Sequence, residues 1–300
     1  MSRSQDFPTG EGHKPYYSVS KYKTMKDCPY RYWLERVEKV WQRPAAWFAH
    51  GTAFHTAAEE FERSGRTLTL DQAQDAFRDA YVAGINEATS ETPNMAYWFS
   101  SGHYKGAADV ERRFEIGLEQ VTGYLEYYSE VAPREVIWIT PDGTPAIELA
   151  FDVEFGGIRV VGYIDQVPEV QPAIPKPKSK SKAAVAAYEK ALAETAYKPI
   201  PRDLKSGSTP GDAFQLGTYS AALDVLYGLR ADTGDYWMAG TQSRKAGPTR
   251  PYDLTDWTPE AVGAEFQWLD QEVRAERFDP TPGPQCRRCS VADSCDFSQV

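Results

Sequence analysis

Two stretches of the chain, Val160-Val-Gly-Tyr-Ile-Asp-Gln-Val167 and Pro201-Arg-Asp-Leu-Lys-Ser-Gly207, have the pattern of β-strands that each carry an acidic side chain. Side chains alternate along a strand, so Asp165 shares a face with apolar neighbours and Asp203 points to the same side as Lys205. A carboxylate in apolar company costs several kcal/mol unless it is compensated. The alternatives are an Asp165 that faces water at a strand end and an exposed Asp203–Lys205 surface pair.

This arrangement of two acids and a lysine is suited to metal-dependent hydrolysis. Carboxylates on neighbouring strands can hold a hard divalent cation such as Mg²⁺. A lysine beside the cation can orient or help deprotonate a water, while the cation stabilises charge on a phosphoryl oxygen. Asp165, Asp203 and Lys205 are therefore the first candidate site residues.

Two helical segments supply further candidates. Gln215 and Tyr219 are four residues apart on a predicted helix, so they lie on one face and can both donate hydrogen bonds to phosphate oxygens. His55 lies in a predicted helix of small and apolar residues. An ordinary half-buried helix face and a core histidine are the alternatives. His55 and Glu59, also four apart, could bind zinc together, although the full H-E-x-x-H pattern is absent.

The cysteines are placed unevenly along the chain. Cys28 stands alone near the start, and Cys286, Cys289 and Cys295 form a C-x2-C-x5-C group at the end. A C-x2-C turn aims two sulfurs at one point, so the four thiols could together grip a metal. Sulfur ligation suits zinc as well as iron–sulfur clusters, and two disulfides or four unrelated thiols are the remaining alternatives.

The pattern of the chain predicts one α/β domain. Residues 1–15 are expected to form a disordered lead and residues 16–297 a single domain, with a flexible, lysine- and proline-rich insertion at 168–199. The helices are expected at 18–27, 30–40, 46–63, 70–87, 105–131, 183–196, 212–229 and 259–277. The strands are expected at 134–140, 146–155, 158–167, 200–205, 234–241 and 250–254, with a hairpin turn at Gly156-Gly157.

Composition limits the class of protein. The chain has 300 residues, of which 41% are hydrophobic, and a formal net charge of −10. These values and the lack of a long apolar run predict a folded, soluble, cytoplasmic protein without a membrane partner. The net charge disfavours a polyanionic partner at first sight, but Lys and Arg outnumber Asp and Glu by seven to three in 21–43 and by eight to three in 173–205. A basic surface on an acidic body is therefore compatible with DNA.

The order of these motifs resembles one family. Six motifs occur in sequence over residues 16–297: Cys28-Pro with Arg31-Tyr-Trp, Gly51-x3-His55, Gly162-x-Ile-Asp165, Asp203-x-Lys205-x-Gly207, Gln215-x3-Tyr219 and the terminal C-x2-C-x5-C. They resemble the PD-(D/E)XK nucleases of the RecB-like branch that carry an iron–sulfur cluster, such as CRISPR-associated exonucleases and the nuclease domain of AddB proteins.

The resemblance implies a restriction-endonuclease-like core, a mixed central sheet flanked by helices, and an exonuclease acting on single-stranded or end-exposed DNA. Mg²⁺ or Mn²⁺ would be bound by His55, Asp165 and Asp203, and Lys205 would position the attacking water. Gln215 and Tyr219 would support the site and contact DNA. A [4Fe–4S] cluster on Cys28, Cys286, Cys289 and Cys295 would join the two ends of the chain. The partners implied are DNA and a helicase, recombination or CRISPR protein.

The chain departs from that family in two ways. Asp203 stands where many relatives have Glu, and Asp165 and Asp203 are 38 positions apart where the family normally has a short hairpin. The phosphate-binding loop of motor proteins is absent, so any unwinding would come from another protein. The rival interpretations are a non-catalytic iron–sulfur DNA-binding or assembly protein of the same fold and a zinc-bound structural protein.

Overall fold

The computed structural model describes residues 7, 14–172, 174, 176–240 and 244–298. The expected disordered lead at 1–15 therefore lies largely outside the described residues. Of that segment, Phe7 is buried, and its ring centroid lies 5.3 Å from that of Tyr163. In the described part of the chain, no helix has both the length and the apolar character needed to cross a membrane.

The central sheet has the order β2-β3-β6-β7-β8, with β9 paired to β7. Strands β6 and β7 are parallel and the other pairs are antiparallel, so the sheet is mixed, as the sequence predicts. The hairpin turn between the two long strands lies at Gly156-Gly157, where both residues have positive φ. The strands are β2 (Ile147–Phe155), β3 (Ile158–Gln166), β6 (Arg202–Lys205), β7 (Thr233–Met238), β8 (Gly247–Pro248) and β9 (Tyr252–Asp253).

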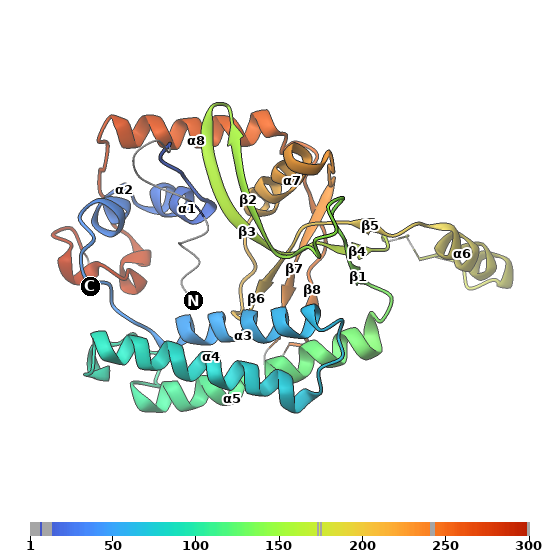
Figure 1. Ribbon diagram of the computed structural model, residues 1–300, viewed down its shortest axis with the longest axis horizontal. Coiled ribbons are helices and arrows are strands. Elements are labelled where there is room, and N and C mark those ends of the chain that lie inside the picture. Colours follow the sequence, from blue (N-terminus) through green and yellow to red (C-terminus); the bar gives the residue numbers. More distant parts are fainter. Residues whose placement is uncertain (1–6, 8–13, 173, 175, 241–243, 299–300) are drawn as a thin grey trace.

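Helices cover both sides of the sheet (Figure 1). One hydrophobic core joins α1, α7 and α8 to β2 and β3, and the other joins α3, α4 and α5 to β6 and β7. The two helical layers place the sheet between them, which confirms the expected α/β architecture. Their bounds are α1 (Val19–Asp27), α3 (Ala46–Arg63), α4 (Leu70–Glu91), α5 (Ala107–Glu126), α7 (Ala213–Tyr227) and α8 (Pro259–Arg274).

Helix α3 has the bounds that the sequence predicts, and its packing explains its small residues. Ala53, Phe54 and Ala57 are fully buried against α4, α5 and the sheet. Alanine at these positions lets the neighbouring helices approach closely while Phe54 fills the space between them. His55 follows Phe54 and lies where α3 meets β6, with its Nε2 3.0 Å from the carbonyl oxygen of Leu204.

The insertion at 168–199 is more regular than expected. Its ends pair as β4 (Pro168–Val170) and β5 (Lys198–Pro199), and β1 (Val136–Ile137) completes a small three-stranded sheet. Between them, α6 (Lys182–Glu194) has no buried residue and extends away from the body (Figure 1). The strands that flank the insertion still pair, because Gln166 of β3 lies opposite Arg202 of β6.

Three sequence predictions of elements were wrong in extent. The helix expected at 30–40 is a short α2 (Pro29–Tyr32) followed by a π-turn segment at Trp33–Val37, and it ends because Lys39 has φ of 52°. The strand expected at 134–140 is only β1, since Thr140 already belongs to a tight turn in which its N–H donates to Thr144. The helix expected at 105–131 changes from α5 to a π-turn segment at Tyr127–Val131.

The C-terminal segment lies beside α2 (Figure 1). The C-terminal segment contains two short 3₁₀ turns, Pro284–Arg288 and Ala292–Ser294, and a third such turn lies at Met95–Tyr97. Arg43 donates two hydrogen bonds to Asp293, and its backbone N–H donates to Ser290. These contacts attach the C-terminal segment to the chain just before α3.

Candidate active site

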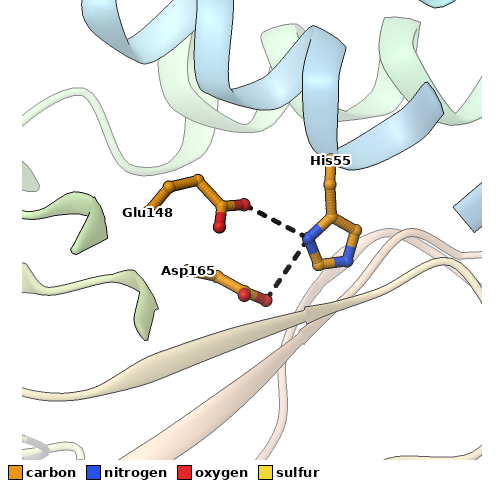
Figure 2. A group of neighbouring side chains, drawn as sticks. All are labelled: His55, Glu148 and Asp165. Carbon is orange, nitrogen blue, oxygen red and sulfur yellow. Dashed lines mark ion pairs between the residues drawn. The ribbon is translucent and has the colours of Figure 1, made fainter. Parts of the chain in front are cut away.

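His55, Glu148 and Asp165 form a compact group between α3 and the sheet (Figure 2). His55 Nδ1 lies 3.6 Å from Glu148 Oε1 and 3.5 Å from Asp165 Oδ2. Each residue offers one atom suited to a metal, and these atoms lie within 4.8 Å of one another. An imidazole nitrogen and two carboxylate oxygens are ligands that Mg²⁺, Mn²⁺ or a similar divalent ion accepts.

Glu148 is the residue of this group that the sequence reasoning missed. The pairs Ile147–Gln166 and Leu149–Ile164 place it opposite Asp165 on the neighbouring strand. Side-chain alternation puts Glu148 on the face of β2 whose later residues are exposed to solvent. In the sequence it therefore looks like an ordinary solvent-exposed acid of a strand. Only the position of α3 over this end of the sheet makes the face a site. One signal in the sequence could have indicated Glu148. It is an acid near the start of the strand that pairs with the strand of Asp165.

The backbone of Leu204 orients the histidine and the first aspartate. Its N–H donates to Asp165 Oδ2 over 2.7 Å, and its carbonyl oxygen lies 3.0 Å from His55 Nε2. A carbonyl can only accept, so Nε2 carries the proton, and Nδ1 is the nitrogen directed at the carboxylates. In the neutral ring Nδ1 is free to act as a ligand, which is the arrangement expected for a metal-binding histidine.

Asp203 and Lys205 point to the same side of β6, as their spacing predicts. Lys205 Nζ lies 2.6 Å from Asp203 Oδ2, and the lysine side chain keeps 30% of its exposure while that of Asp203 keeps 3%. The Lys205 ammonium is therefore the charge partner of this buried oxygen. A carboxylate oxygen has two lone pairs, so Asp203 can still accept a cation beside the lysine.

Gln215 and Tyr219 contact Asp203 from α7. Gln215 Nε2 donates to Asp203 Oδ1, and the Tyr219 hydroxyl lies 3.3 Å from the same oxygen. Lys23 of α1, which the sequence reasoning did not single out, donates from Nζ to Gln215 Oε1 over 2.9 Å. Asp203 is thus contacted directly from α7 and supported from α1 through Gln215. Glu59, the other residue considered as a zinc ligand, pairs with Arg63.

The carboxylates disfavour one another's charge. Burial, followed by the charges of Asp203 and Glu148, raises the pKa of Asp165 to about 7, although His55 opposes the shift. Burial alone would lower the pKa of His55, but the charges of Asp165, Glu148 and Asp203 outweigh it and raise that pKa to about 9. A divalent cation would relieve this repulsion, so the charge distribution as well as the donor atoms fits such an ion.

A second group lies between α2 and the C-terminal segment, where the four cysteines line one cavity together with Arg31, Leu34 and Val291. All four are free thiols. Cys28 Sγ accepts the N–H of Thr281, and Cys286 Sγ accepts the N–H of Gly283, each over 3.4 Å. The structure therefore brings together the cysteines that the sequence groups. Backbone donors directed at sulfur are one of the features that stabilise bound thiolates.

Comparison with known proteins agrees with this geometry. A family model described as the PD-(D/E)XK nuclease superfamily matches residues 16–296. The chain is 44% identical over 286 residues to the Gene 69 protein of Mycobacterium phage D29, with 94% of this chain and 96% of the relative covered. It is 40% identical over 305 residues to the Gene 69 protein of Mycobacterium phage L5, again with 94% and 96% covered. The chain therefore belongs to the PD-(D/E)XK nuclease superfamily.

Proposed function

We propose that the protein is a metal-dependent DNA exonuclease that hydrolyses phosphodiester bonds in single-stranded or end-exposed DNA. The observation that carries this proposal is the position of the Asp203–Lys205 pair beside the His55–Glu148–Asp165 group. A cation-binding group and a half-exposed lysine next to it are the parts needed for attack of water on a phosphate.

The proposed roles follow from the contacts. His55, Asp165 and Asp203, joined by Glu148, would hold Mg²⁺ or Mn²⁺, which would stabilise charge on the phosphoryl oxygen and lower the pKa of water. Lys205 would orient the attacking water, since its ammonium is anchored on Asp203 and still reaches solvent. Gln215 and Tyr219 would keep Asp203 in place.

The activity test is a time course on end-labelled single- and double-stranded DNA with Mn²⁺ or Mg²⁺. Lys205→Ala should lower the rate roughly 100-fold or more, as expected for loss of a group that assists proton transfer. Lys14→Ala is a matched control, because Lys14 is an exposed lysine paired with Glu154. Intact DNA with the wild type, or equal rates for wild type and Lys205→Ala, would contradict the proposal.

Metal binding is measured separately by calorimetric titration with Mn²⁺. Glu148→Gln removes one negative ligand and should weaken binding roughly 10- to 100-fold, the range measured for residues that tune a metal site. Glu154→Gln on the same strand is the control, because Glu154 is exposed and pairs with Lys14. Equal affinities of the two variants would remove Glu148 from the site.

We also propose a [4Fe–4S] cluster on Cys28, Cys286, Cys289 and Cys295. The four cysteines line one cavity, and the backbone N–H groups of Thr281 and Gly283 donate to two of the sulfurs. Hydrogen bonds to sulfur are among the features that tune iron–sulfur clusters. Sulfur ligation also suits zinc, so metal content distinguishes the two.

Colour and metal content test the cluster. Protein prepared without air should be brown and contain iron, and Cys28→Ser should lose iron and melt at a lower temperature. Serine exchange at Cys28 also tests whether the group joins both ends of the chain. Zinc in a colourless protein would instead support the structural-protein alternative. DNA binding without cleavage would support the non-catalytic alternative.

The proposal includes the biological process in which the nuclease acts. The two relatives come from bacteriophages. Recombination or repair of phage DNA in the host cytoplasm is therefore our preferred role, with processing of CRISPR-type DNA as the other. The partner would be a helicase or recombination protein that exposes DNA ends.

A further inference from the structure

Phe48 is an apolar side chain on the surface close to the proposed nuclease site. It is 55% exposed, whereas most aromatic residues of α3 and its neighbours are buried. Phe48, Thr52 and His55 follow one another at four- and three-residue steps, so they lie on the same face of α3. Seven residues of helix correspond to about 10 Å, which places the ring within a few nucleotides of the metal-binding group.

On this face of α3 the residues between Phe48 and His55 are small. They are Gly51 and Thr52, and a Cβ at Gly51 would lie 3.6 Å from Ser206 Oγ. Ser206 directly follows Lys205, so this turn of α3 lies against the end of β6. Phe48 consequently lies one helical turn beyond the end of the strand that carries Asp203 and Lys205.

Phe48 belongs to a supported group of rings, which we call the aromatic rim and define as Trp47, Phe48 and Phe99. The Trp47 ring meets Phe48 edge-on at 5.9 Å and stacks on Phe99 at 5.6 Å. The guanidinium of Arg113 lies 5.9 Å from the Trp47 ring centre and that of Arg43 lies 5.2 Å from the Phe99 ring centre. Packing on one side therefore restrains Phe48 while the ring stays open to solvent.

The exposed aromatic ring indicates which kind of ligand the aromatic rim can bind. An exposed aromatic ring is a common platform for bases of single-stranded nucleic acid, because every base offers a π-face, and Phe48 is the exposed ring of the aromatic rim. In a duplex the bases already stack on one another, so a ring on the surface finds no face to contact. The position beside a site for phosphate hydrolysis makes a DNA strand the occupant that both features fit.

We propose that Phe48 stacks on an unpaired nucleobase of the DNA strand whose phosphate lies at the His55–Glu148–Asp165 group. The inference rests on the proposed nuclease function and deepens it, since it makes single-stranded DNA the preferred substrate. Phe48 is a specificity-determining residue in this account. Lys205 and the acids act on the phosphate, while the aromatic rim holds the base and so sets the register of the strand.

The first measurement is binding of a labelled single-stranded oligonucleotide by anisotropy, without added divalent metal. Phe48→Ala should weaken binding roughly 5- to 100-fold, the effect of losing one stacked base, and Phe48→Trp should retain or improve it. Val82→Ala on α4 is the control, because Val82 is 52% exposed and α4 contributes no residue to the proposed site. Melting temperatures of all variants should match the wild type, since the Phe48 ring is largely outside the core.

The second measurement pairs the ring with its base. An abasic nucleotide is scanned through the few positions flanking the cleaved phosphate, and cleavage is compared for wild type and Phe48→Ala. At one position, removing the base should raise the KM of the wild type by about the same factor as Phe48→Ala raises the KM for the intact substrate. At that position, the variant acting on the abasic substrate should have no higher KM than either single change gives. Duplex DNA should show little dependence on Phe48.

The outcomes separate this inference from the function. If the wild type cleaves DNA and Phe48→Ala binds and cleaves single strands equally well, the stacking site is wrong and the nuclease stands. If Phe48→Ala loses binding but the wild type cleaves nothing, the nuclease is wrong and the stacking site stands. If the effects of the abasic nucleotide and of Phe48→Ala on KM multiply at every position, the ring and the base act independently and the stacking site is wrong. Phe48 would then contact another ligand, such as a partner protein.

Discussion

His50 should make the stability of the protein depend on pH in a way that can be calculated. The residue is 1% exposed in α3, and its Nε2 donates to Gln120 Oε1 over 2.8 Å. Gln120 in turn donates to the carbonyls of Ser206 and Gly240, at the ends of the two parallel strands. His50 Nδ1 has no hydrogen-bond partner among the described residues, so a proton there would be buried without an acceptor.

The direction and size of the effect follow from the pKa. Burial, followed by the charges of Arg113 and Arg112 and opposed by the bond to Gln120, lowers the pKa of His50 to about 4 from the usual 6.5. Below pH 6.5 the unfolded chain takes up a proton that the folded protein refuses, so stability falls as pH decreases toward 4. At about 1.4 kcal/mol per pH unit the loss is about 2 kcal/mol by pH 5 and about 3 kcal/mol in full.

The contribution of His50 to the pH dependence of stability is measured by urea unfolding of wild type and His50→Gln at about pH 7.5 and pH 5. The free-energy difference between the two proteins should shrink by about 2 kcal/mol at the lower pH, because other titrating groups cancel in the difference. A difference that stays constant would refute the reasoning. Should His50→Gln not fold, an NMR titration of the wild type suffices, and an imidazole that protonates near its usual pKa would refute it equally.

Three further changes test the packing and the proposed site. Gly117→Ala should destabilise the protein by about 1–3 kcal/mol in thermal unfolding, because its Cβ would lie 1.9 Å from the Phe77 ring, whereas Gly123→Ala in the same helix has 3.4 Å of room and should be neutral or stabilising. Arg202→Met should cost about 3–5 kcal/mol in urea unfolding, since it leaves the carboxylates that the buried guanidinium pairs with uncompensated. Lys23→Met should lower the cleavage rate roughly 10-fold, because it removes the ammonium that donates to Gln215 and so loosens the support of Asp203, and an unchanged rate would remove Lys23 from the site.

Much of the local structure could be predicted from the sequence alone. The bounds of α3, the Gly156-Gly157 hairpin and the same-side placement of Asp203 and Lys205 depend on helix periodicity, turn chemistry and strand alternation. These are properties of neighbouring residues, so they need no knowledge of the rest of the chain. The grouping of three cysteines at one end is local in the same sense.

Contacts between distant segments were decided by the tertiary structure. Glu148 became part of the site because α3 covers one end of β2, and Lys23 because α1 lies against α7. Neither residue has a local pattern that distinguishes it from a solvated charge. The helix end at Lys39 and the pairing of β4 with β5 likewise depend on contacts made elsewhere in the fold.

The sequence by itself determined which residue types carry the chemistry, because acids, a lysine and cysteines at fixed spacings limit what a strand, a helix or a turn can present. Only the tertiary structure decided that Glu148 joins His55 and Asp165 in one group, near the charge of Asp203, and that Cys28 lines one cavity with three cysteines more than 250 positions away. The physical reason is that burial and Coulombic repulsion depend on distances in space and not on positions along the chain. These distances are set only when the sheet packs between its two helical layers.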